Sequence, residues 1–188
     1  RWTARRAVET LVYGASIVTT GSLSIHGGDG AVATSETGSL EVVVTLRPGV
    51  DDDHAAETVT FVATRDAAAT WWNEHWRSGA AVSFAGSSEP GAAELERRVV
   101  LSQYLLAVNS AGATPPAETG LTYNTWTGKF HLEMHWWHAA HFALWGRGHL
   151  LERSLGFYHS ALPSARETAR SQGYRGARWP KQTDPSAR

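Results

Sequence analysis

The stretch DAAATWWNEHW at residues 66–76 marks a change in the pattern of the sequence. Before it, apolar and β-branched residues come in short runs between turn residues. The stretch itself opens with Asp66 and three alanines. Asp is a favoured helix N-cap, and alanine has the highest helix propensity. We therefore expect a helix that begins at Asp66 and ends near Gly79.

The residues before this stretch follow a β pattern. They contain four apolar or β-branched runs, at residues 11–13, 16–20, 40–46 and 58–64. Clusters of Gly, Pro and Asp separate the runs, as in GGDG at 27–30 and RPG at 47–49. Short strands bounded by turn residues are typical of an antiparallel β-sandwich. We predict that residues 1–65 are the C-terminal part of such a sandwich.

Helical patterns follow. After a linker helix and connector at 66–91, we expect helices at residues 92–109, 130–145, 149–161 and 164–172. The short links GRG and Pro163 predict neighbouring helices that run roughly antiparallel. The connection from 112 to 128 is long and contains Pro115 and Pro116, and long loops in compact domains are often functional.

Composition narrows the function classes. The 188 residues carry 17 basic and 18 acidic side chains and a formal net charge of −1, which gives no electrostatic case for binding nucleic acid or a membrane. Cysteine is absent, so thiolate chemistry is excluded. The nine tryptophans either fill a helical core or present flat apolar faces on which sugar rings stack.

The segment GKFHLEMHWWHAAH at residues 128–141 concentrates histidine and tryptophan. If it is one helix, His131, His135 and His138 lie within about 60° of one another, a spacing that suits zinc. Glu133 would then lie on the opposite side of that helix, and the His-Glu-x-x-His order typical of zinc proteases is missing. Histidines packed by hydrogen bonds among indoles are the simpler alternative, and we predict no metal.

A sugar site is a third interpretation of this segment. Trp126, Lys129, His131 and Glu133 would stand at a junction between loop and helix and point into a pocket. A stacking ring, donors and a carboxylate acceptor match the needs of a polyhydroxylated ligand. Glu118 is either a second carboxylate of the same cleft or a solvated loop residue.

From residue 66 to 180 the chain resembles glycoside hydrolase family 65 of the six-hairpin glycosidase superfamily. The likeness rests on the tryptophan-rich helix and on four blocks that follow one another in the family's order. These blocks are GKFHLE at 128–133, LLERSLGFY at 150–158, LPSARETA at 162–169 and GYRGARWP at 173–180. A weaker likeness to family 95 involves PPAETG at 115–120 and HLEMHWW at 131–137.

The resemblance implies a partial (α/α)6 toroid at residues 92–188, preceded by the sandwich. It implies an oligosaccharide or glycoside substrate and an inverting reaction, with no cofactor beyond inorganic phosphate as a possible co-substrate. Arg175 and Arg178 would line the cleft or pair with carboxylates. The family's general acid would lie downstream of residue 188, so we expect an internal fragment that is inactive and aggregation-prone by itself.

The chain also departs from the family pattern. His131 stands where family 65 has the Asp that holds the sugar, and Lys181 and Gln182 replace an expected Trp-Glu pair. No characterised specificity can therefore be transferred to this chain. Two other functions stay open: a sugar-binding or scaffolding module with a degenerate site, and a metal-binding protein with a histidine cluster.

Overall fold

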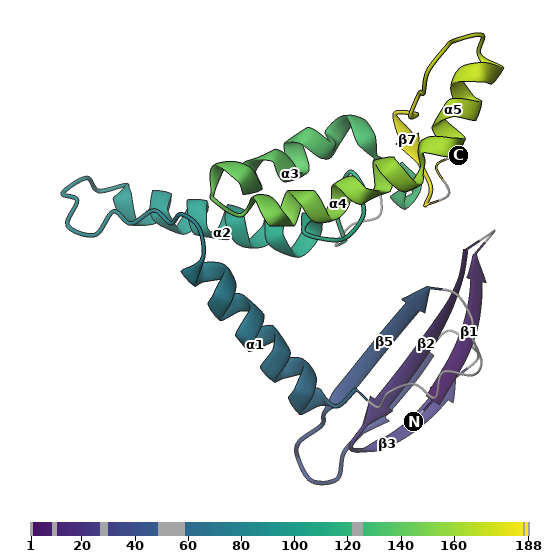
Figure 1. Cartoon of the computed structure of the whole chain (residues 1–188). Helices are drawn as coiled ribbons and strands as arrows, with labels where there is room; N and C mark the ends of the chain where they lie inside the picture. The colour runs from purple at the N-terminus through teal and green to yellow at the C-terminus, as the bar shows by residue number, and fades with distance from the viewer. Residues whose placement is uncertain are drawn as a thin grey trace. The chain divides into compact units, whose positions relative to one another are not determined.

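The computed structural model describes residues 2–8, 11–26, 30–48, 59–121, 126–185 and 187. The chain forms two compact units, Arg1–Glu74 and His75–Arg188, drawn in Figure 1. Each unit is described by itself below. The predicted turn at 27–30 lies, apart from Gly30, outside the described residues.

The first unit contains an antiparallel sheet. Its three strands are β1 (Trp2–Val8), β2 (Leu11–Thr19) and β5 (Val42–Pro48), in the order β1-β2-β5. The register pairs Trp2 with Ile17 and Thr19 with Val42. The two runs predicted on either side of Gly14 and Ala15 form one strand. Both residues pair with β1 on one side and with β5 on the other, and this pairing keeps their backbone extended.

A separate hairpin joins β3 (Ser22–His26) to β4 (Gly30–Thr34). The predicted antiparallel β structure of this region is therefore confirmed. Both faces of the sheet carry apolar side chains. On β5, Val43 is buried, whereas Val44 and Leu46, which lie on the other face, are 59% and 65% exposed. These strands alone do not establish a two-layer sandwich.

Helix α1 (Phe61–Arg77) begins earlier than predicted. The run at 58–64 was expected to be a strand, and Asp66 was expected to be the N-cap. Both predictions are wrong, because the Thr60 hydroxyl accepts a hydrogen bond from the backbone N–H of Ala63 at 3.1 Å, the contact that starts a helix. Asp66 instead pairs with the neighbouring, exposed Arg65. The boundary between the two units falls inside α1.

The second unit is mainly helical. It contains α2 (Ala92–Ser110), α3 (His135–Leu144), α4 (Gly148–Ser160) and α5 (Leu162–Ser171). Except at the start of α3, these bounds agree with the predicted helices to within two residues. Figure 1 shows α3 and α4 side by side, as the short link between them requires. The result is a mixed β and α chain, while a toroid is a finer statement than these helices support.

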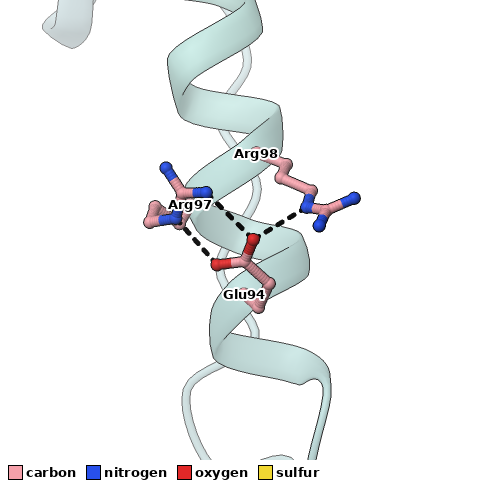
Figure 2. A network of polar contacts seen from close by, with 3 residues as sticks. All are labelled: Glu94, Arg97 and Arg98. Carbon is pink, nitrogen blue, oxygen red and sulfur yellow. Dashed lines mark hydrogen bonds and ion pairs between the residues drawn. The ribbon is translucent and has the colours of Figure 1, made fainter.

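The first turn of α2 carries an exposed ion-pair network, shown in Figure 2. The carboxylate of Glu94 accepts hydrogen bonds from Arg97 at 2.7 and 2.9 Å and from Arg98 at 2.8 Å. These bonds lower the pKa of Glu94 to about 2, with Arg97 as the largest cause and Arg98 next. A negative charge here also complements the helix dipole.

Small residues let the helices of the second unit approach closely. Ala139 on α3 and Ala165 and Ala169 on α5 are almost fully buried, as are Phe142 and Leu150. A cluster joins Phe157 of α4 and Ala161, which follows α4, to Ala187, with Phe130, Leu132, Tyr158 and Trp179 packed around it. Among the helices of this unit, α3 and α4 make the most extensive contact with one another.

Arg147 ties this core to the end of α1. Its side chain is 1% exposed and has no carboxylate partner among the described residues. It donates instead to the carbonyls of His75 at 3.0 Å and Ala80 at 3.3 Å, and to the side-chain oxygen of Gln103 at 3.1 Å. The guanidinium also lies over the Trp76 ring. Burial lowers the pKa of Arg147.

The predicted helix at 130–145 is only partly correct. Phe130–His131 form strand β6, which pairs with β7 (Gln182–Thr183). The 3-10 turn Leu132–Met134 follows, and α3 begins only at His135. The backbone N–H of Leu132 donates to the Lys181 carbonyl at 2.8 Å, so a distant segment of chain holds these residues extended.

Among the described residues, no helix has the length and apolar character needed to cross a membrane.

Candidate functional site

The candidate site lies where the loop after α2 meets the junction that leads into α3. The loop and the junction line a hollow of about 460 Å³ that is open to solvent. It is lined by Val108, Asn109, Gly112, Thr114, Pro115, Pro116, Ala117, Gly120, Leu121, Gly128 and Phe130. Its volume falls within the range of small-molecule pockets.

Asn109 fastens the loop to α2. Its side-chain oxygen accepts a hydrogen bond from the Leu121 N–H, and its amide donates to the Leu105 carbonyl, both at 2.8 Å. Gly120 has a φ of +68°, and a Cβ there would lie 2.4 Å from the Asn109 side-chain oxygen. Glycine is therefore required at this turn, both for its backbone conformation and for the close approach of Asn109.

A short β contact then joins the loop to the junction. Ala117 forms an antiparallel bridge with Phe130, and the His131 N–H donates to the Pro116 carbonyl at 3.2 Å. Ala117 and Phe130 line the hollow, whereas the residues that follow them, Glu118 and His131, are not among its lining residues.

Glu118 and His131 form a pair. The His131 Nδ1 atom lies 3.3 Å from Oε2 of Glu118, and the two side chains are 4% and 24% exposed, His131 being the more buried. The separation is that of an ion pair, but neither atom has a hydrogen bond of good geometry. The second ring nitrogen of His131 is also buried without a hydrogen-bond partner. Unsatisfied buried polar atoms are rare in folded proteins, and each calls for a functional explanation.

His138 of α3 completes the cluster. Its Nε2 lies 3.0 Å from the Glu118 carbonyl. Because a carbonyl only accepts, Nε2 carries the proton and Nδ1 is a bare acceptor, buried without a hydrogen-bond partner. The pKa of His138 is lowered, mainly by burial and also by repulsion from His131, although its bond to Glu118 opposes the change.

Trp126 covers His131. The two rings stack with centroids 6.4 Å apart and planes at 30°, and the indole is 61% exposed. Trp126 has a φ of +53°, the left-handed region that bulky residues rarely adopt. Such strain costs about 1–3 kcal/mol and is concentrated at functional sites. The side chain thus combines an exposed aromatic face with a strained backbone.

His135 belongs to a different, fully bonded network. Its Nε2 lies 2.8 Å from the Ser154 hydroxyl, and its Nδ1 lies 2.9 Å from the Tyr158 hydroxyl. Ser154 donates its own proton to the Leu151 carbonyl, so it accepts from Nε2–H of His135. Tyr158 then donates to Nδ1. Burial lowers the pKa of His135 and raises that of Tyr158.

This arrangement overturns the geometry on which the zinc hypothesis depended. His131 is in a strand and not in the helix of His135 and His138, so the three do not share a helix face. Across the described residues, no group of three or more His, Asp or Glu side chains is placed to hold a metal ion.

The other predicted site residues lie outside the cluster. Lys129 is exposed, and Glu133 forms an exposed ion pair with Lys181 at 3.0 Å. Beyond α5, Arg178 stacks over Tyr174 at 4.7 Å and donates to Gln172, while Arg175 is exposed. Of the predicted residues, the structure thus brings Trp126 and His131 together, and it adds Glu118 and His138 to them.

Comparisons of the chain with protein-family models, with curated proteins and with solved structures give no match.

Proposed function

We propose that the second unit supplies part of the sugar-binding site of a glycoside hydrolase or phosphorylase. The observation that supports this proposal best is the cluster of Trp126, His131 and Glu118. An exposed indole offers an apolar face to a sugar ring, and the buried imidazole and the half-buried carboxylate offer acceptors to its hydroxyl groups.

The family resemblance also supports the proposal. The blocks of sequence that resemble glycoside hydrolase family 65 lie in this unit, and the first of them, residues 128–133, includes His131. In this proposal Trp126 stacks on the sugar while His131 and Glu118 hold hydroxyl groups.

A non-catalytic sugar-binding module is the second candidate. Glycoside hydrolysis generally needs two carboxyl groups, one on each side of the glycosidic bond. Among the described residues, Glu118 is the carboxylate of the cluster, whereas Glu133 is paired with Lys181 at the surface. Glu133 therefore does not supply the second carboxyl group, which favours a site that binds a sugar without cleaving it.

Binding and turnover can be measured separately. Isothermal titration with D-glucose, maltose and trehalose should detect a sugar that binds to the 188-residue chain. Trp126→Ala should weaken that binding by up to about tenfold, because stacking on an aromatic ring contributes about 0.5–1.5 kcal/mol. Release of monosaccharide, with and without phosphate, reports on the enzymatic candidate.

Trp136→Ala is the matched control, because Trp136 is also an exposed tryptophan but lies on α3 outside the cluster. It should leave sugar affinity unchanged. If none of the sugars binds, or if both tryptophan variants weaken binding equally, the proposed site is wrong. Product formation by the 188-residue chain would favour the enzymatic candidate over the non-catalytic module.

A further inference from the structure

Strand β5 forms one edge of its sheet (Figure 1). Among the described residues, β2 pairs with one side of β5 and no strand pairs with the other. The pairing with β2 is continuous from Val42 to Pro48, so no bulge turns the strand aside. Natural proteins usually protect such an edge with charges, proline or a bulge, because its unpaired backbone groups can bind another strand. Residues 42–46 of β5 are Val, Val, Val, Thr and Leu, and they offer no such protection.

The hydrogen bonds of Glu41 show which backbone groups face the open edge. The N–H of Thr20 donates to the Glu41 carbonyl, and the N–H of Glu41 donates to the Thr20 hydroxyl, both at 3.2 Å. Both backbone groups of Glu41 therefore point toward β2. Because these directions alternate along an antiparallel strand, Val42, Val44 and Leu46 direct their N–H and C=O groups away from β2.

The side chains along β5 suit pairing with a second copy of the same strand. Val42, Val44 and Leu46 lie on one face of the sheet and are exposed. Glu41 and Arg47 lie on the other face, at the two ends of this run, and neither has an ion-pair partner among the described residues. Opposite charges at the two ends of a strand are complementary when two copies of it run antiparallel.

One antiparallel register brings all these groups together. When Val44 is placed opposite Val44 of a second copy, Val42 is opposite Leu46 and Glu41 is opposite Arg47 of that copy. Two-fold symmetry repeats each contact between unlike residues. The residues that face the open edge then form the hydrogen-bonded pairs of the ladder, and each pair exchanges two N–H···O bonds. A shift to the next such register in either direction separates the two charges.

We propose that β5 is the interface of a dimer, in which two copies of the chain pair their β5 strands antiparallel with Val44 at the two-fold axis. The two three-stranded sheets become one continuous sheet. Apolar side chains of the two strands form cross-strand pairs on one face, and the pairs of Glu41 with Arg47 lie on the other. This inference concerns the first unit and does not depend on the proposed sugar site.

Sedimentation velocity of the 188-residue chain over a range of concentrations tests for the dimer. The expected result is a reversible shift from the 20.4 kDa of one chain to twice that mass. Val44→Lys should raise the dimer dissociation constant by at least about tenfold, because it sets two ammonium groups opposite each other at the axis. Val32→Lys is the matched control, since Val32 is an exposed valine of β4, and it should leave the dissociation constant unchanged.

A charge exchange tests the register. Glu41→Arg should weaken the dimer by about tenfold, because each Arg47 then faces an arginine. Adding Arg47→Glu to this variant restores opposite charges across the interface and should restore the original dissociation constant. Positions 41 and 47 are about 20 Å apart in one extended strand, so the rescue requires a second copy.

Thermal melts of each variant check that the fold is retained, and the charge exchange decides the matter if Val44→Lys fails to fold. A chain that stays monomeric at every concentration overturns the proposal. So does a dimer that Val44→Lys leaves intact, or one that Val44→Lys and Val32→Lys weaken equally. Failure of the double exchange to restore the dimer also overturns it, because the proposed register requires Glu41 to meet Arg47.

Discussion

The two units of the chain are held together in different ways. In the first, backbone hydrogen bonds join the strands, and Val43 is the buried apolar residue while Val44 and Leu46 remain exposed. In the second, most of the described buried apolar residues lie on helices, and buried polar side chains such as Arg147 and Ser154 form hydrogen bonds among them. Single side chains should therefore matter far more in the helical unit than in the sheet.

The strongest test of this contrast is Arg147→Ala. The substitution leaves the carbonyls of His75 and Ala80 and the side chain of Gln103 without their donor, so unfolding free energy should fall by about 3–5 kcal/mol. Urea denaturation followed by tryptophan fluorescence measures the loss. Arg166→Ala, at an exposed arginine of α5, should change stability by less than about 0.5 kcal/mol. Similar effects of the two variants would show that Arg147 has no special role.

A pair of leucines compares the two units directly. Leu150 is 2% exposed and Leu46 is 65% exposed. Leu150→Ala creates a cavity and should cost about 2–5 kcal/mol, whereas Leu46→Ala should cost under about 1 kcal/mol. Thermal or urea unfolding of both variants gives the comparison. A large loss from Leu46→Ala would mean that the exposed face of the sheet is covered in solution.

Acid should weaken the helical unit through its histidines. Burial is the main cause that lowers the pKa values of His75, His135, His138 and His141 below 6.5. As the pH falls below about 6.5, the unfolded chain binds protons that the folded chain refuses, so unfolding free energy decreases. Urea unfolding at pH 7.5 and pH 5.5 measures the decrease.

His141→Gln provides the control for this pH effect, because it removes one of the four histidines. The difference in stability between the two pH values should become smaller in this variant. Stability that is unchanged or higher at pH 5.5 would contradict a neutral, buried state of these imidazoles.

Much of the helical unit could be predicted from local patterns. The bounds of α2, α4 and α5 follow from helix-forming residues and from the breaks at Gly and Pro, because these preferences act within a few residues. The start of α1 was misplaced because Thr60 and Asp66 are both good N-caps, and β-branched residues between them resemble a strand. Local propensity could not choose between the two caps.

The candidate site was less predictable. The chemistry of His131 and Trp126 predicts a site at these residues, whereas the sequence does not decide between a cleft and a solvated position for Glu118. Arg147 was not singled out at all, because nothing in its neighbours reveals that its partners lie 44 to 72 residues away in the chain. Contacts of this kind are formed by packing and leave no periodic signal in the sequence.

The sequence by itself determined that β structure is followed by helices and which residue types gather before α3. Only the tertiary structure decided that residues 130–131 are a strand, because that strand exists through its pairing with Gln182–Thr183. In this strand, His131 Nδ1 lies 3.3 Å from Oε2 of Glu118. Helix propensity depends on residues that are close in the sequence. The partner of a strand or of a buried charge comes from a segment far along the chain, so it is settled only when the chain folds.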